Sequence, residues 1–576
     1  MYYLKKLLLV WCCTGCLSVV FSKDIPPLER EVTLAVKQKS VEYILTQIET
    51  QTKVRFAYPT ELFLRCPPIS IDIKQKTVRE ALTVVLPSTV YYVVKNNYII
   101  LKNKSLKAAE KSAPITGYVY DGSSNRKLSH VTIYDKKTLQ SATTNKYGYY
   151  SFPVHPENDT IFIRKSAYMH ELVKIDSIKK NELLIIALNP LTDSVSKKDS
   201  VNLYSTFYRV EKEFRLFSKN FRGYINSLNV NDTINRNFQI SFLPFIGSNH
   251  KLSGSVINKV SVNVLGGYSK GITKFEVGGL FNLNRNHMQG LQIAGLTNLV
   301  GGNTEGVQLA GIFNGTYNNF NGVDIAGISN CIGDTANGMF ISGIVNVFNK
   351  SDKSIALAGI ANVSQHVNEC IQVGGIANYS AHGKIALQLA TLYNHAQINN
   401  GLQIGLVNYA DSSSGISIGF LSIVKKGLHQ LEAAADELMY ANLSFRTGTY
   451  KFFNVFNVGC TPGNFKEMKW ALGYGVGTSF KVSEKLRSDI ALTHNHINSG
   501  NFLTGIRDLY KLYWGIERKI YHKMNFCLGP TFNLYAADTA IPGYDAIPPY
   551  SLFKQSAADN ILLAGWIGAK IGFRFF

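Results

Sequence analysis

A motif that returns every 16 residues constrains this chain more than any other feature of its sequence. The clearest copy reads Gly-Leu-Gln-Ile-Ala-Gly-Leu-Thr-Asn at residues 290–298, and related copies extend across 261–424. So strict a period predicts one structural unit repeated along the chain. Six copies share a central Gly followed three residues later by an Asn, at Gly295 and Asn298, Gly311 and Asn314, Gly327 and Asn330, Gly343 and Asn346, Gly359 and Asn362, and Gly375 and Asn378.

Within each copy the residues alternate in character with period two, which is typical of a β-strand. A strand of about ten residues with a turn of about six would fill the unit, and about ten residues is the length of a strand that spans a membrane. The repeats therefore predict antiparallel strands of a membrane β-barrel. One face of the first clear copy holds Leu291, Ile293, Gly295 and Thr297, and the other holds Gln292, Ala294, Leu296 and Asn298.

A parallel β-solenoid is the alternative structure for the repeats. A coil of 16 residues would stack the motif Asn and Gly at one corner and would explain the strict register. The even spacing favours this solenoid, because outer-membrane barrels alternate short turns with long loops. Two features favour the barrel: the repeats lack a large aliphatic residue at every inward position, and the segment after them reads as barrel strands.

That following segment alternates apolar residues with small or polar ones. The pattern holds at 470–480, at 524–534 and in the last strand, 561–575, where Lys570 and Arg574 lie opposite the apolar face. An apolar outer face and a polar inner face are typical of a membrane barrel with an even number of strands. We expect about 18 to 20 strands in a barrel that covers 235–576.

The chain ends in aromatic residues. Phe573, Phe575 and Phe576 resemble the C-terminal assembly signal of outer-membrane β-barrels, with Phe576 one residue beyond the usual register. The resemblance implies two partners, the lipid of the outer membrane and the machinery that assembles barrels in it.

Residues 1–22 have the layout of a signal peptide. Lys5 and Lys6 precede an apolar run from Leu7 to Phe21 that is too short to span a membrane as a helix. We therefore expect export of the mature protein.

Residues 32–103 alternate strand-like and helix-like patterns twice over. The segments Val32–Val36 and Ile69–Ile73 read as strands, and a helical pattern follows each of them. The doubled β-α-β order, with Thr-Val-Arg-Glu-Ala-Leu before the second helix, resembles the secretin and TonB short N-terminal domain. The resemblance implies a periplasmic docking module for a protein partner, an anti-sigma factor or a TonB-type protein.

Residues 115–189 read as an all-β module. Its strands begin at Ile-Thr-Gly-Tyr-Val-Tyr, 115–120, and include Thr-Asn-Lys-Tyr-Gly-Tyr-Tyr-Ser-Phe, 144–152. This order resembles the carboxypeptidase-regulatory-like β-sandwich, a non-catalytic module.

The polar residues 190–234 then predict a linker. Residues 235–424 also resemble outer-membrane proteins with Gly-Leu-Gln-Ile-Gly-Leu-Val-Asn surface repeats.

The sequence offers little catalytic or metal chemistry. Gly473 to Gly477 lacks the spacing and the following helix of a nucleotide loop, so we interpret it as strand. His494 and His496 lack a third ligand at motif spacing, and Asp436 and Glu437 would point to opposite faces of a strand. We expect no catalytic residue, no cofactor, no metal site and no enzymatic activity.

The net charge of +21 does not predict nucleic-acid binding. The repeats at 290–424 carry three Lys against six Asp and Glu, so the basic excess lies mainly before residue 290. We therefore predict a multidomain outer-membrane protein with a small α+β domain, a β-sandwich and a large antiparallel barrel. Its N-terminal modules would lie in the periplasm and serve transport, sensing or signal transduction. The alternative is a surface β-solenoid adhesin or structural scaffold anchored by a C-terminal barrel.

Overall fold

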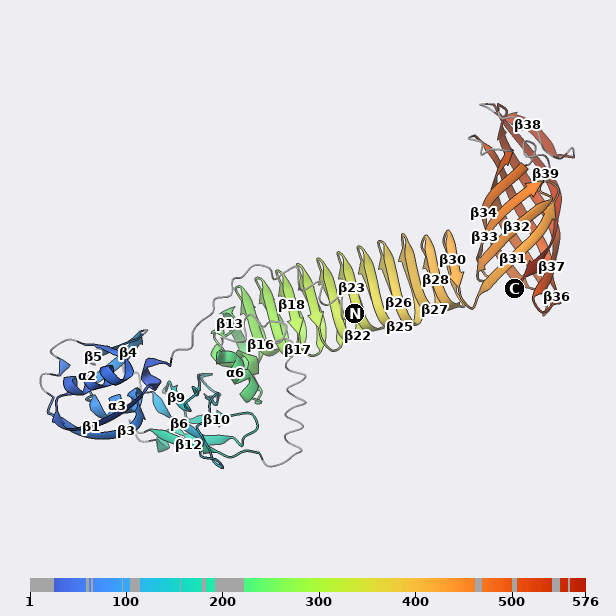
Figure 1. Ribbon diagram of the computed structural model, residues 1–576. Coiled ribbons are helices and arrows are strands. Elements are labelled where there is room, and N and C mark those ends of the chain that lie inside the picture. The colour runs from blue at the N-terminus through green and yellow to red at the C-terminus, as the bar shows by residue number, and fades with distance from the viewer. Residues whose placement is uncertain are drawn as a thin grey trace. The chain divides into compact units, whose positions relative to one another are not determined.

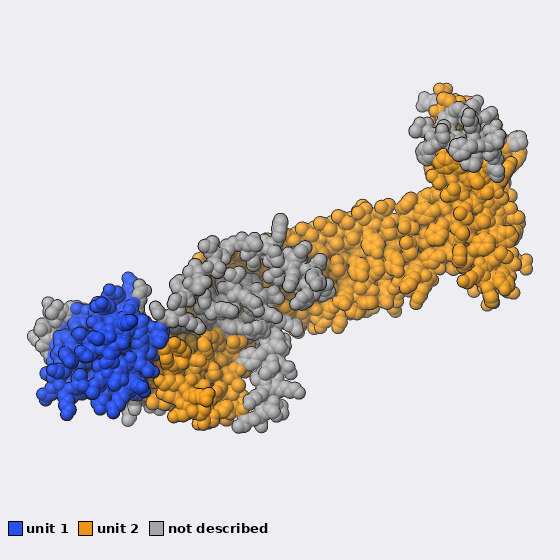
Figure 2. All heavy atoms as spheres, in the orientation of Figure 1, with its two compact units in different colours: residues 1–115, 154–156 blue, residues 116–153, 157–576 orange. Residues whose placement is uncertain are grey.

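The computed structural model divides the chain into two compact units, shown in Figure 2, which are described separately below. The predicted signal peptide and most of the predicted linker lie outside the described residues. The structure describes 25–576 apart from 59–61, 64–65, 96, 104–113, 156, 179–182, 192–221, 462–468, 500–504, 541–547, 549 and 558–559.

The first unit holds two small sheets and two helices (Figure 1). Strands β1 and β3 pair antiparallel, and β5 lies between β2 and β4. Helix α3 begins with a capping box in which Thr77 and Glu80 each accept the other's backbone N–H. The expected order of strands and helices is thus present. The elements are η1 (Pro27–Glu29), β1 (Glu31–Lys39), α2 (Val41–Thr52), β2 (Arg55–Ala57), β3 (Ile69–Thr77), α3 (Val78–Val85), β4 (Val90–Lys95) and β5 (Tyr98–Asn103).

The second unit begins with two β-sheets. One has the strand order β11-β10-β7-β8 and the other β12-β6-β9, so the all-β reading of this segment is confirmed. Asn145 shapes the turn before β9, because its side chain accepts the N–H groups of Tyr147 and Tyr149. The elements are β6 (Ile115–Asp121), β7 (Thr132–Tyr134), β8 (Ser141–Thr143), β9 (Tyr149–Phe152), β10 (Thr160–Arg164), β11 (Glu171–Lys174), η3 (Ile175–Ser177) and β12 (Leu184–Leu188).

A helix occupies part of the predicted linker. Helix α6 (Arg222–Asn229) contributes two buried amides: Asn226 accepts from the Thr132 hydroxyl at 3.0 Å, and Asn229 donates to the His130 carbonyl at 2.6 Å. The 3-10 helix η4 (His250–Ser255) lies next to α6. The end of the predicted linker is therefore packed against β7 and the start of the repeats.

The repeats form a parallel β-solenoid, so the prediction that they are antiparallel barrel strands is wrong. From Asn282 to Asn394, each Asn of the motif pairs in register with the Asn of the next coil, as in Asn298↔Asn314 and Asn314↔Asn330. In Figure 1 the strands β16 to β30 stack side by side in one row. Their bounds are β13 (Ile234–Leu243), β14 (Ile246–Gly247), β15 (Val256–Asn263), β16 (Gly266–Gly278), β17 (Phe281–Ala294), β18 (Thr297–Val300), β19 (Thr304–Ala310), β20 (Phe313–Thr316), β21 (Phe320–Ala326), β22 (Ser329–Ser342), β23 (Val345–Asp352), β24 (Ile355–Ala358), β25 (Ala361–Gly374), β26 (Ala377–Ala390), β27 (Tyr393–Ile404), β28 (Val407–Ser413), β29 (Ile416–Ile418) and β30 (Leu421–Val424).

A corner inside the motif breaks the expected alternation of faces. Gln292, Ala294 and Asn298 are buried as one face, but Leu296 is 42% exposed. The strand ends at Ala294 and the next begins at Thr297, so Gly295 and Leu296 both turn outward. At this corner the coil therefore encloses amides and small residues and carries the aliphatic side chain of Leu296 outside, whereas Met288, Val300 and Ile332 are buried elsewhere in the coils.

A separate eight-stranded antiparallel barrel follows the solenoid. It closes where β31 pairs with β39, from Leu431↔Phe575 to Asp436↔Lys570, and β38 pairs with β39 outside the closed ring. The expected barrel of about 18 to 20 strands is replaced by these eight, an even number. They are β31 (Leu428–Asp436), β32 (Ala441–Gly448), β33 (Phe453–Thr461), β34 (Lys469–Lys481), β35 (Leu486–Ser499), β36 (Arg507–Tyr521), β37 (Met524–Asp538) and β39 (Ile561–Phe575), with β38 at Phe553–Ala557.

The barrel has the predicted apolar outer face. Leu472, Trp514 and Ile567 are about half exposed, whereas Lys570 is turned inward and Arg574 is 1% exposed. Of the three C-terminal aromatics, Phe573 lies on the outer face and Phe575 ends β39. Phe576 follows the strand, and its N–H donates to the Lys523 carbonyl at 3.0 Å.

Candidate functional site

An asparagine ladder runs through the solenoid core. The amide of Asn298 donates to the Leu309 carbonyl at 2.8 Å and to Oδ1 of Asn314 at 2.9 Å, one coil further on. The same pair of contacts recurs at Asn346 and Asn362. Each amide therefore ties its own coil to the next, which explains why the motif keeps its register. The ladder ends in a coil shortened to 14 residues, where Asn394 donates to Asn408 at 2.9 Å.

A second ladder of glutamines lies beside the first. Gln308 donates to Gln292 at 2.6 Å, and Gln388 donates to Gln372 at 2.8 Å. Three consecutive coils interrupt this ladder. The in-register positions there are Asp324, Phe340 and Ala356. Phe340 fills its slot by packing on Phe320 and Phe348, with ring centroids 5.3 and 4.6 Å away.

Two carboxyl groups are buried in this polar core. Glu276 accepts from Asn263 at 3.0 Å and from Gln292 at 2.8 Å. Burial raises its pKa, and those amides oppose the shift. Burial also raises the pKa of Asp324 well above its ordinary value, opposed only by the Asn314 amide. Fewer hydrogen bonds oppose the rise in the pKa of Asp324 than that of Glu276. Asp324 also stands at the start of the break in the glutamine ladder.

Glycine is favoured at the coil corners. A side chain on Gly327 would place its Cβ 2.1 Å from the Gly311 carbonyl oxygen. Gly322, within β21, also has a φ of +137°, which disfavours any residue with a Cβ. The central Gly of the motif thus permits the close stacking of coils. Thr391 occupies this slot in one coil, immediately before the shortened coils.

An aliphatic or aromatic residue projects from the corner of each coil, and we call this row the apolar ridge. Its members directly follow the corner Gly, or Thr391, and nine of the ten are 37–52% exposed. The ridge consists of Leu280, Leu296, Ile312, Ile328, Ile344, Ile360, Ile376, Leu392, Leu406 and Phe420.

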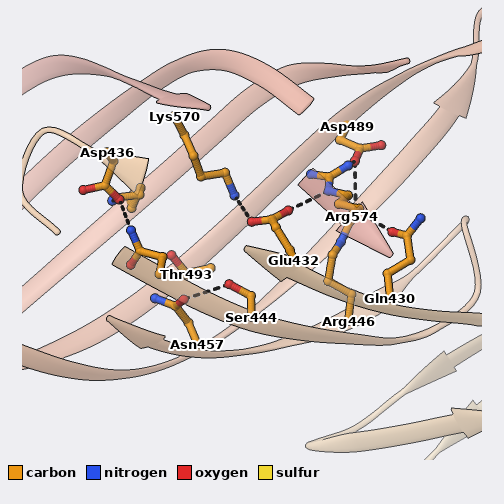
Figure 3. A network of polar contacts seen from close by, with 12 residues as sticks. Gln430, Glu432, Asp436, Ser444, Arg446, Asn457, Asp489, Thr493, Lys570 and Arg574 are labelled. Atoms are coloured by element: carbon orange, nitrogen blue, oxygen red, sulfur yellow. Dashed lines mark hydrogen bonds and ion pairs between the residues drawn. The ribbon is translucent and has the colours of Figure 1, made fainter. Parts of the chain in front are cut away.

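The barrel lumen contains a buried network of charges (Figure 3). Arg574 donates from Nε to Glu432 at 2.6 Å and from Nη1 to Glu517 and Asp489. Arg446 donates to Asp489 at 2.9 Å. These side chains come from β31, β32, β35, β36 and β39, because alternate residues of every barrel strand face inward.

Two lysines complete the network. Lys570 donates to Glu432 at 2.6 Å, and Lys511 forms an ion pair with Asp436. With the two arginines, four cations thus face four carboxylates, so the buried charges balance. Balanced pairing is what makes so many charges tolerable in a confined space.

The lumen leaves little free space around this network. A cavity of about 30 Å³ lies among Glu432, Lys511, Tyr513 and Lys570. That volume holds roughly one or two water molecules. Closer to the other end, Trp566 and Tyr535 belong to a buried apolar cluster, and the Trp566 indole donates to Glu437 at 2.8 Å. Among the described residues of the barrel, the lumen around the charge network is packed by side chains.

The last solenoid coil contacts the outer face of the barrel. The Asn454 amide donates to the Gly419 carbonyl at 2.7 Å, and the Tyr474 hydroxyl donates to the same oxygen at 3.0 Å. Phe420, the last member of the apolar ridge, stacks on Tyr474 with ring centroids 4.9 Å apart. Phe456 meets the Phe420 ring edge-on at 5.4 Å.

The residues considered above for metal or nucleotide binding take part in structural contacts. His494 and His496 both approach Asp508, at 3.2 and 2.8 Å. Among the described residues, no group of three His, Cys, Asp or Glu side chains is placed to hold a metal. Gly473 to Gly477 lie within β34, as predicted.

The expectation that Asp436 and Glu437 point to opposite faces is wrong. Both turn inward, because β31 ends at Asp436 and Glu437 starts the turn, where it accepts from Asn533 and Trp566. The lumen network itself was not predicted. A usable signal was present, since Glu432, Arg446 and Asp489 are isolated charges within otherwise alternating strands.

Comparison with protein-family models, curated proteins and solved structures found no match. Within the part of the chain that the structure describes, no helix has the length and apolar character needed to cross a membrane. The fold and its polar networks therefore carry the functional argument.

Proposed function

We propose that this protein is an outer-membrane anchor for a periplasmic scaffold. In this proposal the eight-stranded barrel sits in the outer membrane, and the solenoid with its N-terminal modules extends from it into the periplasm. Phe573, Phe575 and Phe576 would serve as the signal to the barrel-assembly machinery. No catalytic role and no cofactor is proposed.

The lengths of the barrel connections are the observation that carries this proposal. At the end where β31 starts and β39 finishes, the strands are joined by four, four and two residues. At the opposite end they are joined by four, seven, seven and 22 residues, with β38 inside the last connection. Outer-membrane barrels keep short turns on the periplasmic side and long loops outside. This asymmetry supports a periplasmic solenoid, because the solenoid joins β31 at the short-turn end.

The side chains packed in the lumen help to distinguish an anchoring function from solute transport. The four-plus-four charge network crosses the lumen, and the cavity beside it has space for one or two waters. Eight-stranded barrels in general have an interior that side chains fill. We therefore favour anchoring over solute transport, and the docking of a periplasmic partner at 32–103 over passage through the barrel.

Cysteine labelling of intact cells tests the topology. Tyr550→Cys lies in the long connection between β37 and β39, and His382→Cys lies on an exposed part of the solenoid. With a membrane-impermeant maleimide, we expect Tyr550→Cys to react in intact cells and His382→Cys to react only after the outer membrane is opened. Labelling of the parent chain gives the background of its native cysteines. Reaction of His382→Cys in intact cells would instead support the surface adhesin.

A further inference from the structure

The solenoid is amphipathic in cross-section. Its apolar ridge occupies one corner of every coil, two residues before the motif Asn. The charged residues occupy the opposite side, three to seven residues after the motif Asn, and we call this side the polar edge. All charges of 290–424 except the buried Asp324 lie there: Glu305, Asp334, Lys350, Asp352, Lys353, Glu369, Lys384 and Asp411.

The exposed ridge is not needed to hold the coils together. The asparagine and glutamine ladders and the parallel strand pairing already join each coil to the next. About half of each ridge side chain is buried by packing on its own coil and on its neighbours, and the exposed remainder forms an extended apolar surface of the kind that marks a contact with something else. Ten ridge residues on strands stacked about 4.8 Å apart span roughly 43 Å.

The ridge continues onto the outer face of the barrel. Its last member, Phe420, stacks on Tyr474 and meets Phe456 edge-on. Both partners belong to the outward set of β33 and β34, beside the exposed Val458 and Leu472. Aromatic residues at this position are typical of the level where a barrel meets the membrane interface. The apolar ridge therefore leads directly into the barrel surface that the proposed function places in lipid.

From this continuity we infer that the apolar ridge is a membrane-contact surface, seated at the headgroup and acyl boundary of the leaflet that holds the barrel. The inference rests on the proposed membrane location of the barrel. The chemistry is that of an interfacial amphipathic element, with the apolar side in the bilayer boundary and the charged side in water. The solenoid would thus lie along the periplasmic leaflet, and its polar edge would remain open to periplasmic proteins.

Site-specific photo-cross-linking of the full chain in phospholipid vesicles tests this inference. A benzophenone amino acid replaces Ile344 on the ridge, Gln365 on the polar edge or Trp514 on the barrel's outer face. We expect a phospholipid adduct at Ile344 comparable with that at Trp514, and a background level at Gln365. Because the vesicles contain only this protein and lipid, mass spectrometry identifies each adduct.

The three positions separate failure of the ridge from failure of the barrel. A lipid adduct at Trp514 without one at Ile344 would overturn the ridge inference and leave the anchor proposal standing. No lipid adduct at either position would overturn both. A protein–protein adduct at Ile344 in place of lipid would overturn the inference in favour of a second copy of the chain as the occupant.

A charge substitution gives an independent measurement. Ile360→Lys introduces a cation beside the probe at Ile344 without removing any ladder amide, and His382→Lys introduces the same charge on the polar edge. We expect Ile360→Lys to reduce the Ile344 lipid adduct severalfold and His382→Lys to leave it unchanged. Unchanged adduct in Ile360→Lys, with the solenoid folded by hydrogen exchange, would contradict the inference.

Discussion

At the scale of single residues, buried amides in the solenoid and balanced charges in the barrel stabilise the fold together with apolar clusters. Motif residues such as Asn346 satisfy two donors and one acceptor inside the coil stack, and each ion of the four-plus-four lumen network has an opposite charge at hydrogen-bonding distance. A buried amide or ion strongly reduces the stability of the fold when its partner is missing. Single substitutions that remove one partner should therefore be the most damaging.

Asn346→Ala should destabilise the middle of the solenoid. The change removes donors to Leu357 and Asn362 and the acceptor of Asn330, each at 2.9 Å. Each buried group left without a partner costs about 1–3 kcal/mol. Hydrogen exchange of the full chain, read by mass spectrometry, should show faster exchange around this coil. Asn337→Ala, at an exposed position, is the matched control, and equal exchange in the two variants would contradict the ladder's role.

Asp324→Asn should stabilise the solenoid at neutral pH. Burial raises the pKa of the folded carboxyl well above its ordinary value, whereas the unfolded carboxyl ionises near that ordinary value. Stability therefore falls as pH rises between those two pKa values, and Asn, which has a similar shape, cannot ionise. Thermal unfolding of the solenoid should improve at about pH 7.5, with the gain shrinking towards about pH 4. A gain that is independent of pH would argue against a titrating Asp324.

Arg574→Leu should prevent stable closure of the barrel. It leaves Glu432, Asp489 and Glu517 without their shared cation, and loss of one buried partner costs about 3–5 kcal/mol. The folded barrel can be followed by its altered mobility in unheated gel electrophoresis. Arg518→Leu removes an exposed cation and should fold normally. Normal folding of Arg574→Leu would show that the network is dispensable.

At the scale of elements, the coil is the unit of construction. Each coil contacts its neighbours through in-register strands, and the register is fixed by the motif Asn and by corner glycines such as Gly343. Stability of such an array is a sum over coils and over the interfaces between neighbouring coils. Whole coils should therefore be removable, whereas fractions of a coil should not.

Deletion of 363–378 removes one complete period and should leave a shorter folded solenoid. Tyr379 would then take the place of Val363, and every later residue would keep its inward or outward direction. Deletion of 363–377 is one residue shorter and turns the following inward residues outward. Limited proteolysis should find the first variant resistant and the second cleaved within the repeats. Equal resistance would mean that the 16-residue register is not what holds the coils.

At the scale of the whole molecule, the two compact units have separate cores. The described hydrophobic core of the first unit is drawn from residues between Leu28 and Leu101. A module with its own core can fold and act independently of the anchor. This separation is what a docking function at 32–103 requires.

Deletion of 32–103 should leave the anchor assembled and abolish a periplasmic contact. Because the core of that segment is separate, the barrel should keep its heat-dependent mobility. Cross-linking in whole cells should lose a protein adduct that the parent chain forms. An identical pattern of adducts in both strains would contradict docking through this segment.

The sequence alone predicts the period, the polar and apolar faces and the strands of the C-terminal barrel. It also contains the charges of the lumen, although their pairing across five strands depends on barrel closure. Alternation along one strand does not show which strands will be neighbours. The side chains of Arg574 and Asp489 therefore come together only when the sheet closes into a barrel.

Only the tertiary structure decides between barrel and solenoid for the repeats. Gln292 and Asn298 facing inward, with Leu291 and Ile293 outward, fit a membrane barrel strand and this coil equally well, because both enclose polar groups. What separates them is the corner at Gly295 and Leu296, where two successive residues turn outward and the chain returns parallel to itself. The sequence determines which residues face inward, and hydrogen bonding between coils determines that they line a solenoid and not a barrel.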